Sequence, residues 1–137
     1  RQITDSDLEY LNTAESGPLD FVGWGQWHLR LNFEYVSVEL KHKFTVEVGG
    51  QAKQVAPPYS GELPLGDLFD RHIESFTLET GNYFVISLSG NARICFTVQP
   101  DRPYEQCVIT VHRRAPNDNL DCHLAAAIRR SSSATLL

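Results

Sequence analysis

The stretch that decides the fold is Leu29-Arg30-Leu31-Asn32-Phe33, followed by Val36-Ser37-Val38-Glu39-Leu40 and then by Phe44-Thr45-Val46-Glu47-Val48. In each of the three segments, apolar residues alternate with polar ones. This period of two is typical of a strand with one buried and one exposed face. The segments between them are long enough only for turns, so we expect the three strands to form an antiparallel meander.

The second half of the chain repeats this plan. Residues 72–98 contain three further strand-like runs, separated by the turns Gly81-Asn82 and Ser89-Gly90-Asn91. The segments 27–48 and 72–98 both contain Phe-Thr-Val in their last strand. Self-similarity of this kind indicates an internal repeat. We therefore expect a pseudo-repeat of two meanders within a single domain, residues 1–137.

Helical segments are expected before, between and after the meanders. Ser6 and Glu9 have the spacing of a capping box, which predicts a short N-terminal helix ending before Gly17-Pro18. Apolar residues at helical spacing within residues 65–69 predict one or two turns in the middle of the chain. Residues 105–131 contain an alternating run and then a helical stripe, which predicts a C-terminal strand and helix.

These elements together predict a mainly β fold of the α+β class. Two antiparallel meanders of three to four strands would pack as a sandwich or an open barrel, with the short helices at the ends and in the centre. Residues 51–64 contain three prolines, so we expect them to form a connector without a strand.

Composition limits the classes of function. The 137 residues carry a formal net charge of −5, which argues against general nucleic-acid binding. No apolar run approaches the ~18–20 residues that cross a bilayer, so we expect no membrane span. Three cysteines, an odd number, are typical of free thiols in a reducing compartment, from which we expect a cytoplasmic protein. The first residue is Arg1 and not Met, so we do not expect it to be the natural start.

The sequence contains no motif of the common reaction types. It has no Gly-x-Ser-x-Gly element, no phosphate-binding glycine loop and no Cys or His pairs at zinc spacing. Cys122 and His123 stand at a predicted helix start, but neighbours on a helix point about 100° apart. We predict that the protein is not an enzyme and has no catalytic residue, metal or cofactor.

Acidic residues and one tryptophan are the candidate partner-binding residues. Within Gly23-Trp24-Gly25-Gln26-Trp27 we expect Trp27 to point inwards, because it shares parity with Leu29, and Trp24 to be exposed. Tryptophan is enriched at interaction hot spots, although packing is the alternative role. Glu39 and Glu47 take outward positions on adjacent predicted strands, where cross-strand ion pairs are the alternative. The predicted set is Asp5, Asp7, Glu9, Trp24, Glu34, Glu39 and Glu47.

Four segments follow a short leucine-rich helix in the second half: Arg71-His72-Ile73, Phe84-Val85-Ile86-Ser87-Leu88, Arg93-Ile94-Cys95-Phe96-Thr97-Val98 and Pro100-Asp101-Arg102-Pro103-Tyr104-Glu105. In this order they resemble small bacterial immunity proteins of the two-meander type, which are encoded near polymorphic toxin genes. The similarity covers residues 27–111. That family has Tyr-Glu-x-Trp after the proline-rich turn, whereas Cys107 stands here in place of the Trp and the spacing between the prolines differs.

The resemblance implies a protein that blocks a toxin domain by stoichiometric binding, often a nuclease with a basic active site. An acidic chain suits this role, because charge complementarity steers association. We therefore expect a non-enzymatic binding protein with a protein partner, as a monomer or homodimer. The alternatives are a small-molecule-binding or enzymatic β-barrel with a cavity lined by Phe33, Phe76, Phe84 and Phe96, and an accessory or assembly domain of a larger protein.

Overall fold

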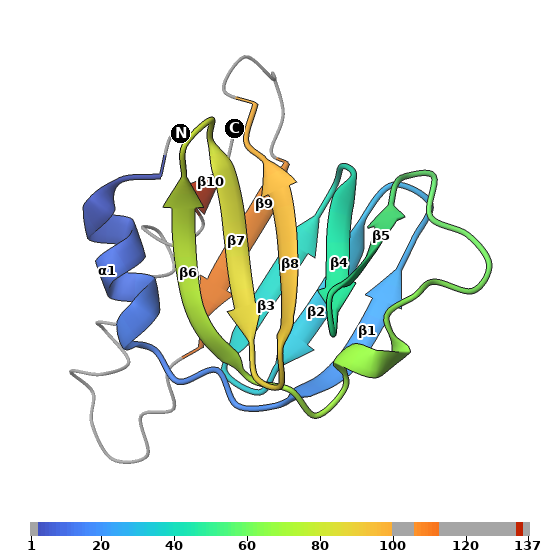
Figure 1. Cartoon of the computed structure of the whole chain (residues 1–137), viewed down its shortest axis with the longest axis horizontal. Helices are drawn as coiled ribbons and strands as arrows, with labels where there is room; N and C mark the ends of the chain where they lie inside the picture. Colours follow the sequence, from blue (N-terminus) through green and yellow to red (C-terminus); the bar gives the residue numbers. More distant parts are fainter. Residues whose placement is uncertain (1–2, 100–105, 113–133, 136–137) are drawn as a thin grey trace.

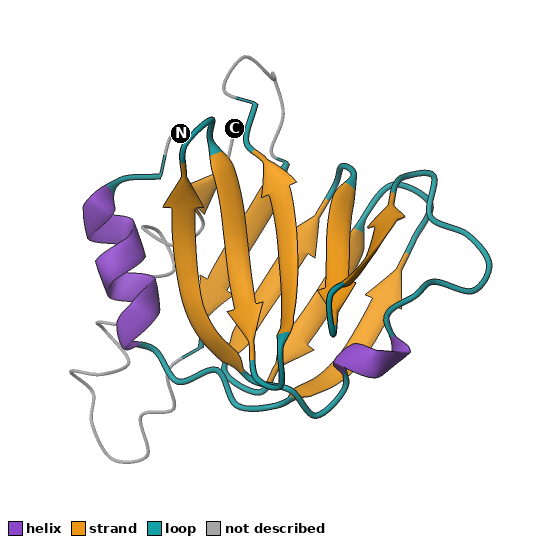
Figure 2. Ribbon diagram, viewed as in Figure 1, coloured by secondary structure: helices purple, strands orange, loops and turns teal. Residues whose placement is uncertain are grey.

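The protein is described by a computed structural model for residues 3–99, 106–112 and 134–135 (Figure 1). Two antiparallel sheets pack face to face, so the predicted mainly β fold is confirmed as a sandwich and not a closed barrel (Figure 2). The first sheet has the order β1 (Leu19–Trp24), β2 (Leu29–Phe33), β3 (Val36–Leu40), β9 (Cys107–Val111) and β10 (Ala134–Thr135). The second has the order β5 (Gln51–Val55), β4 (Phe44–Val48), β8 (Ala92–Thr97), β7 (Tyr83–Leu88) and β6 (Ile73–Glu79). The predicted C-terminal strand corresponds to β9, and the helix predicted after it lies outside the described residues.

The predicted alternation builds the core between the sheets. The inward residues of β2 and β3 are at most 1% exposed: Leu29, Leu31, Phe33, Val36, Val38 and Leu40. Across from them, the ring of Phe84 packs against Phe76 and Phe96, with centroids 6.2 Å and 5.4 Å away. All four phenylalanines proposed to line a ligand cavity belong to the core, where the ring of Phe84 packs on those of Phe76 and Phe96, and Phe96 also borders a surface cavity.

The segment 27–48 is not a three-stranded meander, which corrects the sequence prediction. β1, β2 and β3 are consecutive neighbours in the first sheet, and the chain then crosses at residues 41–43 to the second sheet. There β4 pairs with β5 and β8. In contrast, β6, β7 and β8 do form the predicted second meander. Alternation reveals which face of a strand is buried but not which strand lies beside it, so it could not locate the crossover.

Two edge strands, β1 and β5, form where the sequence predicts none. The register of β1 shifts between Leu19 and Phe21, and its residues do not alternate. β5 exposes its first four residues and buries only Val55. A strand at the edge of a sheet covers less of the core and so lacks the apolar alternation by which a strand is recognised.

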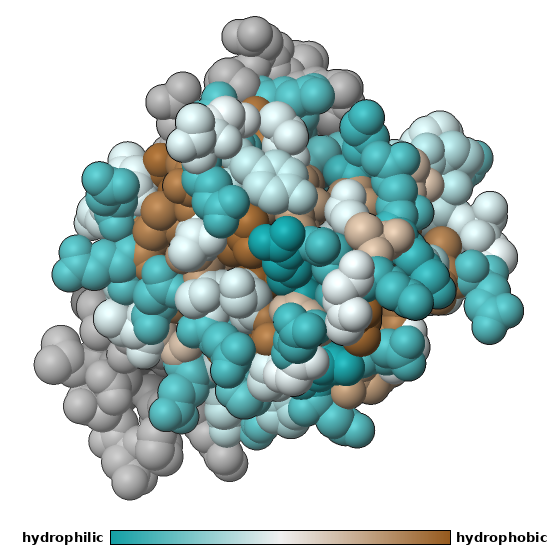
Figure 3. All heavy atoms as spheres, viewed as in Figure 1, coloured by the Kyte–Doolittle hydropathy of each residue, from teal (hydrophilic) through white to brown (hydrophobic). Residues whose placement is uncertain are grey.

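The N-terminal helix α1 (Asp5–Thr13) packs against β6 (Figure 1). Its capping box is formed by Thr4 and Asp7 and not by Ser6 and Glu9: the Asp7 amide donates to Thr4 Oγ1 at 3.1 Å, and the Thr4 amide donates to Asp7 Oδ2 at 2.9 Å. Figure 3 shows apolar side chains gathered where α1 meets β6, with mostly polar ones over the rest of this face. Among the described residues, no helix is both long and apolar enough to cross a membrane.

The connector, residues 56–72, closes the side of the sandwich between β5 and β1. Its residues Tyr59, Leu65 and Leu68 are at most 3% exposed. The Tyr59 hydroxyl donates to the His42 carbonyl at 2.8 Å. The predicted central helix is a 3-10 turn at Gly66–Leu68. The connector is thus part of the core.

Candidate functional site

All four exposed large apolar side chains of the described residues lie along β1. They are Phe21, Trp24, Trp27 and Phe69, which are 51%, 42%, 61% and 43% exposed. Phe21 and Trp24 belong to β1, and Trp27 lies in the turn that follows it. Phe69 lies beside the start of β1, because the amide of the next residue, Asp70, donates to the Leu19 carbonyl at 3.0 Å. We call these four residues the β1 rim.

The turn after β1 exposes both tryptophans. Trp24 is exposed as expected, but the predicted inward orientation of Trp27 is wrong. β2 begins only at Leu29, and the preceding turn is closed by the amide of Gly25, which donates to the His28 carbonyl at 2.9 Å. The alternation of a strand does not continue through a turn, so the parity of Trp27 with Leu29 carried no information about its burial.

A bulge turns Phe21 towards the outer face of the first sheet. The register shift after Leu19 places Phe21 opposite Asn32, which takes an outward position on β2. The ring lies over Gly23, where an added Cβ would come within 2.7 Å of Phe21 Cζ. A residue without a side chain is therefore required at position 23 for Phe21 to keep this place.

Acidic side chains surround the β1 rim. The connector runs beside β1, from Tyr59, whose amide donates to the Gln26 carbonyl, to Asp70. The exposed acidic residues on β1, on the connector and in the turn between β2 and β3 are Asp20, Glu34, Glu62, Asp67 and Asp70. Of the two nearby arginines, Arg30 pairs with Glu39 at 2.7 Å. Arg71 donates to three backbone carbonyls and keeps its positive charge. The five carboxylates outnumber the one unpaired guanidinium, so the charge around the β1 rim is mainly negative.

The predicted partner-binding residues do not form one surface. Asp5 and Glu9 are exposed on α1, which lies beside β6 and away from β1 (Figure 1). Asp7 is only 7% exposed and serves the capping box, so its assignment as an exposed binding residue is wrong. Of the predicted set, only Trp24 and Glu34 lie at the hairpin of β1 and β2. Trp24 is next to the turn that joins the two strands, and Glu34 is at the opposite, open end of the hairpin.

Glu39 and Glu47 belong to different sheets and point away from each other. Glu39 lies on the outer face of the first sheet and pairs with Arg30, as the cross-strand alternative predicts. Glu47 lies on the outer face of the second sheet and forms an ion pair with Arg93. They cannot contact one partner surface together, because the sandwich separates them.

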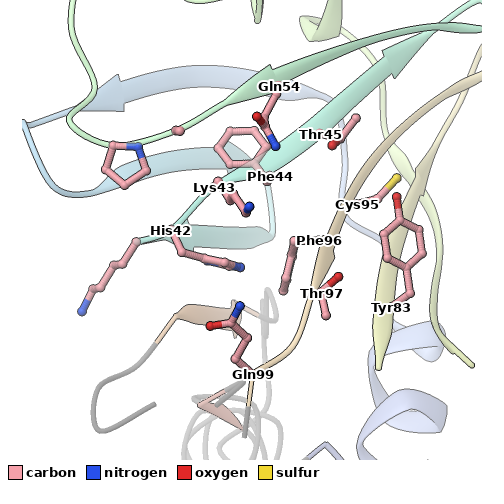
Figure 4. A pocket seen from close by; sticks show the side chains of 13 residues that line it. His42, Lys43, Phe44, Thr45, Gln54, Tyr83, Cys95, Phe96, Thr97 and Gln99 are labelled. Carbon is pink, nitrogen blue, oxygen red and sulfur yellow. The ribbon is translucent and has the colours of Figure 1, made fainter. Parts of the chain in front are cut away.

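A cavity of about 470 Å³ opens where β4 and β8 separate (Figure 4). These strands pair from Val48–Ala92 to Thr45–Cys95 and no further. Beyond that point, β4 still pairs with β5 at Phe44–Val55, and β8 still pairs with β7 at Thr97–Tyr83. The two strands therefore diverge, and we call the cavity between them the β4–β8 cleft.

The β4–β8 cleft is lined by ammonium, amide and hydroxyl groups together with apolar side chains. The polar residues are Lys41, Lys43, Gln54, Gln99, Thr45, Thr97 and Tyr83, and within residues 3–99 and 106–112 no carboxylate lines the cleft. His42 packs edge-on against Phe96, with ring centroids 4.8 Å apart. Its Nδ1 donates to the Gln106 carbonyl at 3.1 Å, which fixes the orientation of the imidazole.

The surroundings of the thiol in the cleft wall disfavour its ionised, nucleophilic form. Cys95 is buried, its Sγ lies 3.8 Å from Glu47 Oε2, and it accepts a hydrogen bond from the Tyr83 hydroxyl. Burial raises the pKa of Cys95, although Tyr83 and Arg93 act in the opposite direction. The hydrogen bond to Cys95 is also the main cause that raises the pKa of Tyr83 to about 12. Both groups are protonated at neutral pH and cannot act as a general base.

In the part of the chain that the structure describes, no group of three or more His, Cys, Asp or Glu residues is placed to hold a metal ion. Cys95 and Cys107 are buried free thiols there, as their strand positions predict.

Comparison of the chain with protein-family models, curated proteins and solved structures finds no match.

Sequence reasoning missed three residues of the β1 rim and the whole β4–β8 cleft. Phe21 and Trp27 stand within three residues of Trp24 in a stretch without alternation, and this density of aromatic residues is the signal that could have revealed them. The cleft gives no local signal. It unites residues 41–45, 54–57 and 95–99, which only the crossover and the sheet pairing bring together.

Proposed function

We propose that the protein is a non-enzymatic binding protein that neutralises a toxin domain by forming a stoichiometric complex, as its resemblance to immunity proteins implies. The observation that carries the proposal is the β1 rim, which holds all four exposed large apolar side chains of the described residues. Single exposed apolar residues are ordinary, but a group along one edge strand favours an interaction surface. The register places Phe21 opposite outward Asn32 and Trp24 opposite inward Leu29, so a partner would contact β1 from both sides of the edge. Tryptophans at such a surface commonly supply most of the binding energy.

The acidic border of the β1 rim favours a basic partner. The four carboxylates of Asp20, Glu62, Asp67 and Asp70 outnumber the one basic group beside them, Arg71, because Arg30 is paired with Glu39. Complementary charge accelerates association and disfavours acidic partners. We therefore expect the rate of complex formation to fall as ionic strength rises.

The test is co-expression with the product of the adjacent gene. We expect a complex of one copy of each chain on size-exclusion chromatography and restored growth of cells that make the partner. Trp24→Ala and Trp27→Ala should each weaken the complex by about tenfold or more, because they remove aromatic anchors. The midpoint of thermal unfolding should change little, since both side chains are more than 40% exposed.

Substitutions on α1 provide the matched control. Asp5→Asn and Glu9→Gln remove exposed charges far from the β1 rim and should leave the complex intact. The absence of both a complex and growth rescue with the wild-type chain would overturn the proposal. A complex that tolerates both tryptophan substitutions would show that the β1 rim is not the binding surface.

A further inference from the structure

The β4–β8 cleft has the size and the charge of a ligand site, and it is separate from the β1 rim. We propose that it binds a small organic anion, whose phosphate or carboxylate group lies against Lys43 and whose apolar part lies against Phe96. This assignment does not depend on the proposed function, because no residue of the β1 rim lines the cleft.

The end of the ladder between β4 and β8 opens the cleft to polar ligands. In a continuous antiparallel pair, Phe44 would stand opposite Phe96, but the pairing stops one step earlier, at Thr45–Cys95. The backbone groups that face each other beyond this step no longer bond across the ladder. The two strands leave a gap there, and the side chains that line the cleft surround it.

The side chains of the cleft favour negative charge. Among the residues that the structure describes, neither Lys41 nor Lys43 forms an ion pair, although both line the cavity. Figure 4 shows Lys43 and Gln99 on the two sides of Phe96, with Gln54 farther along the cleft beside Phe44 and Thr45. Lysine ammonium and amide N–H groups are donors that bind phosphate and carboxylate oxygens. An anion would therefore find donors and no competing carboxylate among the described residues that line the cleft.

The apolar wall of the cleft is held in place before any ligand binds. The ring of Phe96 packs against His42, whose Nδ1 donates to the Gln106 carbonyl and whose own carbonyl accepts from Tyr59. A wall fixed in this way reduces the entropy lost on binding. The cavity of about 470 Å³ lies within the range of about 300–1,000 Å³ that small-molecule sites occupy.

Phenyl phosphate is the probe for the test, because it combines a doubly ionisable phosphate with an aromatic ring. Inorganic phosphate supplies the charge alone, and phenol supplies the ring alone. By isothermal titration calorimetry we expect saturable binding of one phenyl phosphate per chain, tighter than that of either fragment. Lys43→Gln should weaken this binding by about tenfold or more, since it removes one charge-assisted contact.

Lys53→Gln is the matched control, because Lys53 is exposed on β5 and does not line the cleft. It should leave the affinity for phenyl phosphate unchanged, as should Trp24→Ala on the β1 rim. An absence of saturable binding would overturn the proposal, as would an equal loss of affinity in Lys43→Gln and Lys53→Gln. Equal affinity for phenol and phenyl phosphate would likewise overturn it, since the anionic group would then contribute nothing.

Discussion

Asn12 pairs with the backbone of Phe76 as a residue of a neighbouring strand would. Its Nδ2 donates to the Phe76 carbonyl at 2.9 Å, and its Oδ1 accepts from the Phe76 amide at 2.7 Å. Phe76 lies in β6, which is the last strand of the second sheet. An unpaired edge strand invites pairing with another chain, so α1 closes this edge with a side chain instead of a strand.

We expect Asn12→Ala to lower the free energy of unfolding by about 1–3 kcal/mol, because it removes both hydrogen bonds and leaves the backbone groups of Phe76 without partners. Asn12→Asp keeps the acceptor for the Phe76 amide but sets a carboxylate oxygen against the Phe76 carbonyl oxygen, so it should also destabilise the protein. Urea unfolding measures both effects. Glu9→Gln, on the exposed side of α1, is the control and should change stability by less than about 0.5 kcal/mol. Equal stability of Asn12→Ala and the wild type would contradict the role of this contact.

Arg71 connects the end of the connector to the turn between β7 and β8. Its Nε donates to the Asp67 carbonyl at 2.7 Å, and its Nη1 donates to the carbonyls of Ser89 and Gly90 at 2.9 Å and 2.7 Å. A guanidinium reaches two loops at once because its donors are fixed in a planar fork, which an ammonium lacks. We expect Arg71→Lys to cost about 1–3 kcal/mol of unfolding free energy.

Arg30→Lys is the control for Arg71→Lys. Arg30 also donates through Nε and a terminal nitrogen, but to the Glu39 carboxylate on an exposed face, with 51% of its side chain accessible. Exposed ion pairs contribute about 0–1 kcal/mol, so this substitution should have a small effect on thermal unfolding. Similar losses for the two substitutions would show that Arg71 stabilises the fold only as a surface charge.

The strands that cover the core could be predicted from the sequence, whereas the assignment of strands to sheets could not. In β2 and β3, one face is buried and the other is solvated, and the sequence must alternate to satisfy both. Nothing in that alternation distinguishes a turn to a neighbouring strand from a crossing to the opposite sheet. The chain crosses at residues 41–43, and the short segment there is compatible with either path.

The candidate sites were harder to predict because they depend on where regular pairing fails. Phe21 is exposed because of a bulge, and Trp27 is exposed because a turn interrupts the parity of β2. The β4–β8 cleft exists because a ladder ends while both of its strands continue. Sequence patterns describe the regular parts of strands, so bulges, turns and ladder ends leave no comparable signal.

Stability should fall at alkaline pH because of Tyr59. Burial raises the pKa of its hydroxyl to about 12, with a smaller contribution from Cys107, whereas the unfolded chain has the ordinary value of 10.0. A folded-state pKa above the unfolded value means that this contribution is fully present below pH 10 and is lost as the pH rises through about 12. The loss amounts to about 2–3 kcal/mol.

Tyr59→Phe isolates this effect in urea unfolding between pH 8 and pH 12. Below pH 10 the wild type should be more stable by about 1 kcal/mol, because only tyrosine donates to the His42 carbonyl. Above pH 10 this advantage should shrink and then reverse, since phenylalanine does not ionise. Burial raises the pKa of Cys95 and Cys107 in both variants, so their titration cancels in the difference. A difference that stays constant with pH would contradict the raised pKa of Tyr59.

Fluorescence quenching reports directly on the charge around the β1 rim. Trp24 and Trp27 are the two tryptophans of the chain, and they are 42% and 61% exposed. Carboxylates concentrate cations and repel anions within a Debye length of about 8–10 Å. The neutral quencher acrylamide measures how accessible the two tryptophans are. After correction for this accessibility, we expect the quenching constant of Cs⁺ to be higher in the native protein than in N-acetyltryptophanamide. The quenching constant of I⁻ should be lower.

Charge-removing substitutions determine whether the carboxylates around the β1 rim cause this preference. Glu62→Gln should bring the Cs⁺ and I⁻ values closer together, because Glu62 follows Tyr59, whose amide donates to the carbonyl of Gln26 between the two tryptophans. Glu79→Gln is the control, because it removes one negative charge at the end of β6, away from β1. It should leave the difference between Cs⁺ and I⁻ quenching unchanged. Added NaCl should reduce the preference by screening. Equal normalised quenching by the two ions, or stronger quenching by I⁻, would show that the rim is not acidic in solution and would remove the reason to expect a basic partner.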